Sequence, residues 1–237
     1  MMSQKLIYEG KAKKIFETEH ANELMMEFKD SLTAFNAQKK GQFQGKGKLN
    51  CLISTHIFKV LSANGISHHW IKTENDNQMI VQKTQIIPLE VVVRNVLAGS
   101  LAKKVGREEG QRLSCPLVEF YYKDDALNDP FVSEPQIIEF KWATETQLEK
   151  MKKMALEINQ ILVPHFIKAG LDIIDFKVEF GINSSREIIL ADEISPDCMR
   201  LWDVKTKEKF DKDRFRRDLG NVEEAYQSVY ERLEGIL

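Results

Sequence analysis

The segment DIIDFKVEFGI, residues 172–182, limits the possible folds most strongly, because its side chains alternate in character. The apolar positions are Ile174, Phe176, Val178 and Phe180, and the charged positions between them are Asp175, Lys177 and Glu179. Successive side chains of a β-strand point to opposite faces, so this alternation predicts a strand with one face on the core. Solvated strand faces more often carry Thr, Ser and Lys, so two acids flanking a base need an explanation.

A second strand, EIILADE (residues 187–193), follows this segment after a polar turn. A four-residue loop over 183–186 would place Lys177 opposite Asp192, with Glu179 one diagonal step from Asp192 on the same face. Two carboxylates and an ammonium would then share one surface of the sheet. They would form either a solvated cross-strand salt bridge, worth about 0.5 kcal/mol, or a Mg²⁺ site that substrate phosphates complete.

The composition is that of an ordinary globular protein with a full core. The 237 residues are 43% hydrophobic and 30% charged, and the formal net charge is −2. This near-neutral charge argues against a nucleic-acid binder, and the sequence has neither a membrane-spanning apolar run nor a secretion signal. Three widely spaced cysteines without a ligand pattern favour reduced thiols. We therefore expect a cytoplasmic protein that binds neither nucleic acid nor membrane.

Strand-like and helical segments alternate along the chain, which predicts an α+β fold of two lobes. Residues 1–84 are mostly strand-like, with one amphipathic helix expected over 45–65. The segment QIIPLEVVVRNV then begins a nearly continuous apolar run, typical of a strand buried on both faces. This run indicates a change of domain near residue 85, so the second lobe is expected to cover 85–237.

Two helices are expected in the second lobe. The apolar repeat of residues 146–170 predicts a long helix that contains Pro164. Asn221 and Glu224 have the spacing of a capping box, so the last helix is expected to begin there.

Two further segments combine basic or hydroxyl side chains with glycine, a combination that suits phosphate binding. In YEGKAKK, Lys11 and Lys13 are expected on the same strand face beside a glycine that lets a ligand approach the backbone. In RNVLAGS, Ser100 opens a short helix and lies close in sequence to Arg94. Surface lysines and an N-cap serine are the simpler explanations. The segment DEISPDCMRLWD also concentrates charge around a Pro turn, which is costly without a ligand.

Taken together, these motifs resemble those of the SAICAR synthetase family. The resemblance is carried in order by YEGKAK, SLTAFNAQKK, PLEVVVRNVLAGS, DFKVEFG, DEISPDCMRLWD and KFDKDRFRRDLG, from about Leu6 to Gly220. It implies an ATP-dependent ligase of purine biosynthesis that joins the imidazole carboxylate CAIR to L-aspartate, giving SAICAR, ADP and phosphate. It also implies a kinase-like N-terminal lobe, an ATP-grasp-like C-terminal lobe with ATP between them, a Mg²⁺ cofactor, an acyl phosphate intermediate and a homodimer.

The resemblance also implies roles for the residues that match the family's motifs. The expected ATP-binding residues are Lys11, Lys13, Gln82, Lys83, Lys123 and Lys177. The expected metal ligands are Glu179 and Asp192. The expected CAIR-binding residues are Arg94, Ser100, Asp175, Asp197 and Arg200, of which Asp175 and Asp197 are also expected to be catalytic with Lys177. Asp129 is assigned to L-aspartate, although Lys123 and Asp129 equally fit an exposed acidic turn.

Three positions depart from the family's usual residues, namely Asn36, Cys51 and Cys198. If Cys198 is exposed beside the site, thiol reagents should inhibit the enzyme. Two other functions are compatible with the same nucleotide-binding motifs, a kinase-like phosphotransferase and a regulatory module without turnover. The sequence lacks the HRD catalytic loop and DFG motif of protein kinases, which argues against the first.

Overall fold

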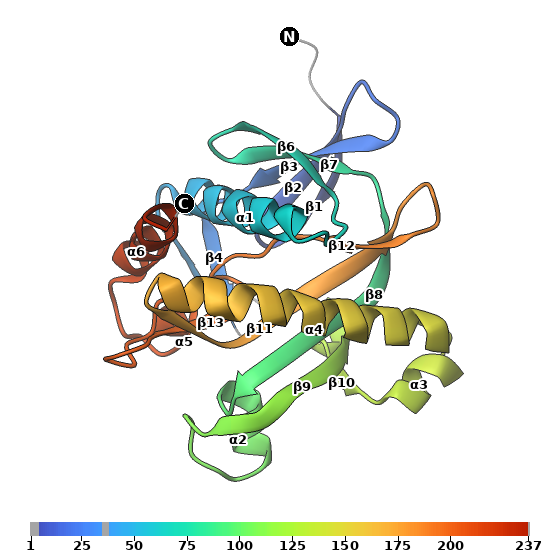
Figure 1. The fold of residues 1–237 in the computed structure, drawn as a ribbon. Helices are drawn as coiled ribbons and strands as arrows, with labels where there is room; N and C mark the ends of the chain where they lie inside the picture. The colour runs from blue at the N-terminus through green and yellow to red at the C-terminus, as the bar shows by residue number, and fades with distance from the viewer. Residues whose placement is uncertain (1–4, 35–37, 237) are drawn as a thin grey trace.

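The computed structural model describes residues 5–34 and 38–236, so Asn36 lies outside the described residues. It contains helices together with antiparallel sheets, which confirms the expected mixture of α and β structure (Figure 1). The first sheet has five strands in the order β1 (Leu6–Glu9), β2 (Lys13–Glu17), β3 (Glu23–Phe28), β7 (Gln78–Gln82) and β6 (Trp70–Asn75). A separate pair is formed by β4 (Ser31–Ala34) and β5 (Lys39–Gln42).

The second sheet contains the strand that the sequence analysis began with. Its order is β10 (Phe131–Val132), β9 (Arg112–Tyr122), β8 (Gln85–Val96), β11 (Leu171–Ile182) and β12 (Ile188–Ala191), and β13 (Met199–Asp203) also pairs with β11. From Val91 to Val96, β8 has no exposed residue, as the apolar run predicts. No residue of β11 is exposed either, so the charged face of β11 is not a solvated surface.

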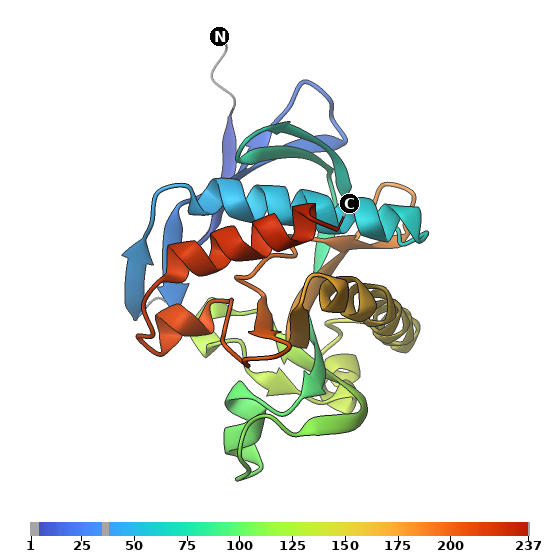
Figure 2. The same cartoon turned by 60° about the vertical axis from the view of Figure 1, so that its left-hand side comes forward.

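Long helices cover the two sheets. Helix α1 (Lys46–Ala63) packs on β3, β6 and β7, and α4 (Glu145–Lys168) packs on β11 and β8. The last helix, α6 (Val222–Glu234), returns to lie beside α1 (Figure 2). The shorter helices are α2 (Gly99–Lys104), the 3₁₀ turn η1 (Asp125–Leu127), α3 (Glu134–Glu139) and α5 (Asp213–Arg216). Within the described residues, no helix has both the length and the apolar character needed to cross a membrane.

The expected capping box at the last helix is wrong. Asn221 has a left-handed backbone (φ 49°) and its side chain caps nothing. Capping boxes occur instead at α3, between Ser133 and Gln136, and at α4, between Thr144 and Gln147. Both use Gln rather than Glu as the third helical residue, which is an equally good partner for the cap.

The expected register of the β11–β12 hairpin is wrong by one residue. Ile182 pairs with Ile188 and Glu179 pairs with Ala191, so Lys177 does not face Asp192. The loop has five residues rather than four, because the Asn183 side chain accepts hydrogen bonds from the N–H groups of Ser185 and Glu187.

A buried histidine pair joins two of the long helices. His56 of α1 is 4% exposed, and its Nε2 lies 2.7 Å from Nε2 of His165 on α4. A contact this short holds a single proton between two neutral rings. Burial, the neighbouring His165 and Lys59 lower the pKa of His56 to about 4, and Glu234 lies 3.9 Å from its Nδ1.

We predict that this pair makes the fold sensitive to acid. An unfolded imidazole has a pKa of 6.5, so between pH 6.5 and about 4 the unfolded chain binds more protons and stability is lost as pH falls. The loss is at most about 1.4 kcal/mol per pH unit for one proton. His56→Gln, which keeps a polar contact but does not titrate, should show a shallower decline of the unfolding free energy in urea from pH 7 to pH 5.

The variant has to be compared with the wild-type protein at each pH, because another group acts in the opposite direction. Burial and the charge of Asp213 raise the pKa of Asp211 to about 7, so this carboxyl stabilises the fold as pH falls towards its unfolded value of 3.8. The two proteins share this contribution, and it cancels in their difference. Parallel stability curves for the two proteins would contradict the prediction.

Candidate active site

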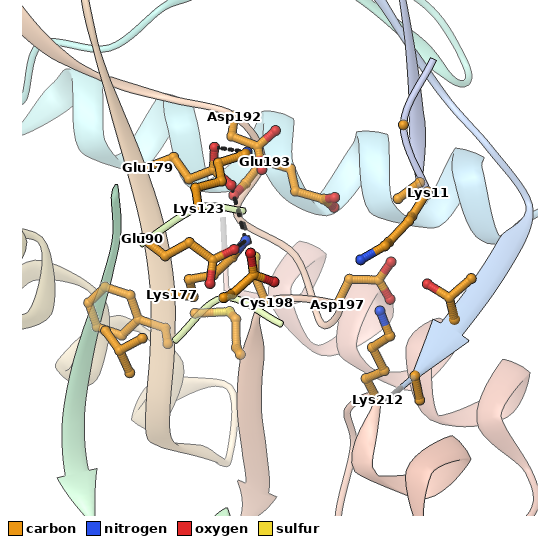
Figure 3. A pocket seen from close by; sticks show the side chains of 18 of the residues that line it. Lys11, Glu90, Lys123, Lys177, Glu179, Asp192, Glu193, Asp197, Cys198 and Lys212 are labelled. Carbon is orange, nitrogen blue, oxygen red and sulfur yellow. Dashed lines mark hydrogen bonds and ion pairs between the residues drawn. The ribbon is translucent and has the colours of Figure 1, made fainter. Parts of the chain in front are cut away.

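One cavity of about 620 Å³ lies between the two sheets and gathers most of the charged residues that the sequence singled out. Its walls come from the β1–β2 turn, β4, β8, β11 and the segments 192–200 and 212–216 (Figure 3). Eleven of the fourteen predicted site residues line it, namely Lys11, Lys13, Arg94, Lys123, Asp129, Asp175, Lys177, Glu179, Asp192, Asp197 and Arg200. Residues that are up to 189 positions apart in the chain, Lys11 and Arg200, therefore face one space.

Three predicted residues do not line the cavity. Ser100 is exposed on α2, and its Oγ is 3.4 Å from Nη2 of Arg94. The backbone N–H groups of Gln82 and Lys83 donate to the carbonyls of His69 and Asn22. These N–H groups are therefore already engaged within the fold.

The charged face of β11 forms a cluster of lysines and carboxylates. Glu179 is 2% exposed, and its Oε1 lies 3.1 Å from Nζ of Lys177. The Lys177 ammonium also lies 2.6 Å from Glu90 of β8, and Lys123 forms an ion pair with the other oxygen of Glu179. Burial opposes the charge of Lys177, but Glu179, Glu90 and Asp192 raise its pKa well above the ordinary value. This lysine is therefore a permanent cation.

Asp192 joins the same cluster from beyond the end of β12. Its backbone is left-handed (φ 62°) at the point where the strand has stopped, which ends the alternation of faces. The carboxylate forms an ion pair with Lys13, whose Nζ also lies 3.1 Å from Glu193. Although burial alone would raise it, Lys13, Lys123 and Lys177 hold the pKa of the Asp192 carboxyl well below its ordinary value.

The YEGKAKK segment differs from the prediction in one respect. Residues 10–12 connect β1 to β2, so Lys11 lies outside both strands. The expectation that Lys11 and Lys13 share one strand face is therefore wrong. Lys11 reaches across the cavity to Asp125 (2.7 Å), whereas Lys13 points to Asp192. The two ammonium groups nevertheless line the same cavity.

The lysine and carboxylate cluster has the donor set of a hard cation. Glu179 and Asp192 offer only oxygen, and Mg²⁺ prefers one or two carboxylates with water and phosphate oxygens completing the shell. The part of the chain that the structure describes contains no group of three or more His, Cys, Asp or Glu residues placed to hold a metal. An ion bound by these two carboxylates would therefore depend on the substrate for further ligands.

A second cluster pairs arginines with acids. Asp175 is 4% exposed and accepts hydrogen bonds from Arg94 (2.9 Å) and Arg200 (2.8 Å). Arg94 also donates to Glu119 (2.6 Å), and Arg200 to Asp213 (3.0 Å). The carboxylate of Asp175 thus orients two guanidinium groups, and it also lines the cavity where the resemblance implies a contact with the substrate.

Gly99 is required where this cluster meets α2. A Cβ on Gly99 would lie 2.3 Å from Nη2 of Arg200, and the backbone there is left-handed (φ 58°). Both conditions favour glycine over any other residue. The AGS motif therefore allows the Arg200 guanidinium to lie against the start of α2.

Asp197 belongs to a buried triad that the sequence did not reveal. Its two oxygens lie 2.5 Å from Nζ of Lys46 and 2.7 Å from the hydroxyl of Tyr226. Lys46 is 0% exposed at the start of α1, and Tyr226 lies on α6. The triad therefore ties both helices to the cavity wall, and Asp197 is less available to a substrate than the resemblance implies.

Cys198 lines the cavity but its thiol is not activated. Its sulfur accepts a hydrogen bond from the N–H of Ser195 (3.2 Å) and donates to the carbonyl of Glu193 (3.4 Å). Burial and Glu193 raise the pKa of Cys198 to about 12. The reactive species of a cysteine is the thiolate, so little of it exists here at neutral pH.

We predict, contrary to the sequence-based expectation, that alkylation spares activity. Cys115 is exposed and should react with iodoacetamide first, while Cys198 reacts slowly. Peptide mass spectrometry at successive times, with turnover measured on the same samples, checks this order. Equal labelling of the two cysteines, or inhibition that follows Cys115 labelling, would contradict it.

The geometry defines a class of protein before any comparison is made. A cluster of lysines and oxygen ligands facing a pair of arginines is typical of enzymes that bind phosphorylated substrates and transfer phosphoryl groups. The profile of the SAICAR synthetase family matches residues 6–233, and the chain belongs to this family.

Individual relatives match the whole chain. The phosphoribosylaminoimidazole-succinocarboxamide synthase of Bacillus cytotoxicus is 53% identical over 235 residues, covering 99% of this chain and 98% of that protein. The crystal structure of the Ehrlichia chaffeensis enzyme of the same name has a TM-score of 0.95 at 45% identity, covering 98% of this chain and 100% of that one. A SAICAR synthetase solved in complex with ADP has a TM-score of 0.94 at 46% identity, with 98% of both chains covered.

Proposed function

We propose that the protein is an ATP-dependent ligase that joins CAIR to L-aspartate, giving SAICAR, ADP and phosphate in purine biosynthesis. Full-length similarity to the Bacillus cytotoxicus enzyme supports this reaction, and the ADP complex of a relative at 46% identity supports ATP as the co-substrate. The observation that carries the proposal is the single cavity in which the lysine and carboxylate cluster faces the arginine pair.

The lysines of the cavity are the proposed ligands of the ATP phosphates. Lys11 lies in the β1–β2 turn and Lys13 begins β2 of the first sheet, whereas Lys123 directly follows β9 and Lys177 lies on β11 of the second sheet. In this structure their ammonium groups neutralise carboxylates. Phosphate oxygens offer alternative acceptors, so the same lysines can pass from carboxylate to phosphate when a nucleotide binds. The proposed division into lobes at residue 84, with ATP between them, rests on this placement and on the family resemblance.

Glu179 and Asp192 are the residues that would hold Mg²⁺, and the ion would share the charge of the transferred phosphoryl group. Lys177 is the side chain proposed to accompany that group, because its ammonium lies on the cavity wall between Glu179 (3.1 Å) and Glu90 (2.6 Å). Glu179, Glu90 and Asp192 raise the pKa of Lys177 well above its ordinary value in this structure, so it can offer a positive charge to the phosphoryl group. Neutralisation of charge accounts for most of the catalysis in phosphoryl transfer.

Arg94 and Arg200 are the proposed ligands of the CAIR phosphate, with Ser100 behind Arg94. Asp175 fixes both guanidinium groups, and bidentate geometry makes arginine suitable for phosphate. CAIR held by this pair would face the lysine cluster across the cavity. That arrangement brings its carboxylate towards the γ-phosphate of ATP.

We propose an acyl phosphate as the intermediate. A carboxylate oxygen of CAIR attacks the γ-phosphorus and ADP leaves; the aspartate amine then attacks the acyl carbon, loses a proton and expels phosphate. A free carboxylate would instead have to expel oxide. CAIR labelled with ¹⁸O in the carboxylate should transfer one label to the released phosphate, and unlabelled phosphate would exclude the intermediate.

One assay tests the function itself. ADP release by the purified protein should require both CAIR and L-aspartate, with SAICAR formed in equal amount. ADP release accompanied by protein phosphorylation would instead support a kinase, and ATP binding without turnover would support a regulatory module. We further propose, on the basis of the family resemblance, that the protein is a cytoplasmic homodimer. Analytical ultracentrifugation tests whether it is a dimer.

A further inference from the structure

The basic side chains that line the cavity are almost all paired with acids. The pairs are Lys11 with Asp125, Lys13 with Asp192, Lys123 with Glu179, Lys177 with Glu90, Arg94 with Asp175, Arg200 with Asp213, and Arg216 with Asp213. Lys212 differs from them, since its ammonium forms no hydrogen bond or ion pair with any of residues 5–34 and 38–236. Figure 3 shows this side chain pointing into the cavity towards Asp197.

The surroundings of Lys212 offer its ammonium no free counter-charge within the described residues. The residue lies directly before α5, where its N–H donates to the carbonyl of Pro196 (3.3 Å). Asp197, the acid that Lys212 points towards in Figure 3, is already paired with Lys46 (2.5 Å) and accepts a hydrogen bond from the hydroxyl of Tyr226 (2.7 Å). Burial and the nearby Arg216 lower the pKa of Lys212, whereas Asp197 opposes this effect. Lys212 is half-buried and lines the cavity, so an anionic ligand bound there would supply the counter-charge that the described residues do not.

A second cation strengthens this argument. Arg216 lies four residues after Lys212 and lines the same cavity. Like charges one helical turn apart repel each other. Among the described residues, Arg216 forms an ion pair with Asp213 (2.5 Å), which Arg200 also uses (3.0 Å). The wall formed by Lys212 and Arg216 therefore carries more positive than negative charge, as a site for an anion requires.

The anionic groups of the three substrates can be compared with the cations already proposed to bind them. The proposed triphosphate ligands are the lysines of both sheets, and the proposed ligands of the ribose phosphate are Arg94 and Arg200. The carboxylates of the amino acid have no cation assigned to them. Asp129, to which the resemblance assigns L-aspartate, is itself an anion and cannot neutralise them.

We propose that Lys212, with Arg216 beside it, binds a carboxylate of the amino-acid substrate and so selects a short dicarboxylic α-amino acid. The inference rests on the proposed function. Binding here would hold the amino acid against the wall that also carries Asp197 and Arg200. The amine would then approach the acyl group from the side opposite the lysine cluster.

The test is Lys212→Met, studied by steady-state kinetics with each of the three substrates varied in turn. The KM for L-aspartate should rise at least about tenfold, because a charge-assisted contact is lost, while the KM values for ATP and CAIR stay within twofold. Lys212→Arg should recover most of the affinity. Lys205→Met, at an exposed lysine outside the cavity, is the matched control and should leave all three values unchanged.

A second measurement isolates the carboxylate contact and does not depend on turnover by the variant. Succinate, which lacks the amine, should compete with L-aspartate in the wild-type enzyme. In calorimetric titrations in the presence of ADP and CAIR, succinate binding should weaken by the same factor in Lys212→Met and in Lys212→Gln.

The outcomes separate the inference from the proposed function. A rise in the KM for CAIR rather than for L-aspartate, or unchanged succinate binding in the folded variants, would overturn the inference while the ligase reaction stands. If ADP release by the wild-type protein did not require both CAIR and L-aspartate, or did not occur at all, the proposed function itself would be overturned.

Discussion

Glu179→Gln should abolish turnover, lowering kcat by about 10³-fold or more, which corresponds to about 4 kcal/mol of transition-state stabilisation. The substitution keeps the size of the side chain but removes the charge that would hold a metal ion beside the phosphates. It also places an amide N–H₂ beside the ammonium groups of Lys123 and Lys177. All three groups are hydrogen-bond donors, so the amide nitrogen cannot pair with either lysine.

The fold should survive this change. Lys177 keeps Glu90 at 2.6 Å, and the Lys123 side chain is 41% exposed, so water replaces its lost partner. ADP release at saturating CAIR and L-aspartate, measured over a range of Mg²⁺ concentrations, gives the effect, and thermal unfolding checks the fold. Glu187→Gln is the control, because this exposed acid lies on the same hairpin outside the cavity. Turnover above about a tenth of the wild-type rate would show that Glu179 does not hold a catalytic metal.

The chemistry of the β11 face could be predicted from the sequence, although its geometry could not. Alternation shows which side chains share a face, so the grouping of Asp175, Lys177 and Glu179 needed no structure. The register depended on the Asn183 side chain, which captures two N–H groups and lengthens the loop. Asp192 reaches the cluster by a left-handed backbone turn, which aspartate adopts more readily than most residues, but the alternation of side chains does not predict where such a turn falls.

Local motifs also failed to show which acidic residues on neighbouring strands pair with the basic residues of the cavity. Glu90 was read as part of an apolar strand, yet it lies 2.6 Å from Lys177 because β8 pairs with β11. Strand order is a long-range property, and the sequence gives no signal for it when both strands read as buried. The same reasoning explains the Asp175 pairs, in which Arg94 and Arg200 come from the strands on either side of β11.

The buried triad of Lys46, Asp197 and Tyr226 was the least predictable part of the site. Its members come from three segments that are far apart in the chain, and each has an ordinary local explanation. Lys46 looks like an exposed residue at the start of a helix, and Tyr226 looks like part of an apolar helix face. Only the packing of α6 on α1 reveals that Asp197 lies between them.

Lys46→Met should therefore be strongly destabilising although it leaves the cavity lysines in place, with a loss of about 3–5 kcal/mol in the free energy of unfolding. The Lys46 side chain is 0% exposed and that of Asp197 is 6% exposed, so removing the ammonium leaves a buried carboxylate with Tyr226 as its remaining partner. Urea unfolding at pH 7 measures the loss. Lys48→Met is the matched control two residues later, since its ion pair with Asp76 is exposed and worth less than about 1 kcal/mol.

The pH dependence of the variant shows whether the uncompensated charge is the cause. In the wild-type protein, Lys46 and Lys212 hold the pKa of Asp197 below its ordinary value of 3.8 against the effect of burial. Without Lys46, burial should raise that pKa above 3.8, so the folded variant binds a proton more readily than the unfolded chain and gains stability as pH falls. The difference between Lys46→Met and the wild-type protein should thus shrink between pH 7 and pH 5, and Asp197→Asn added to Lys46→Met should restore part of the loss at pH 7. A deficit that stays constant with pH would instead indicate that packing around the lysine stem, rather than the buried charge, accounts for the effect.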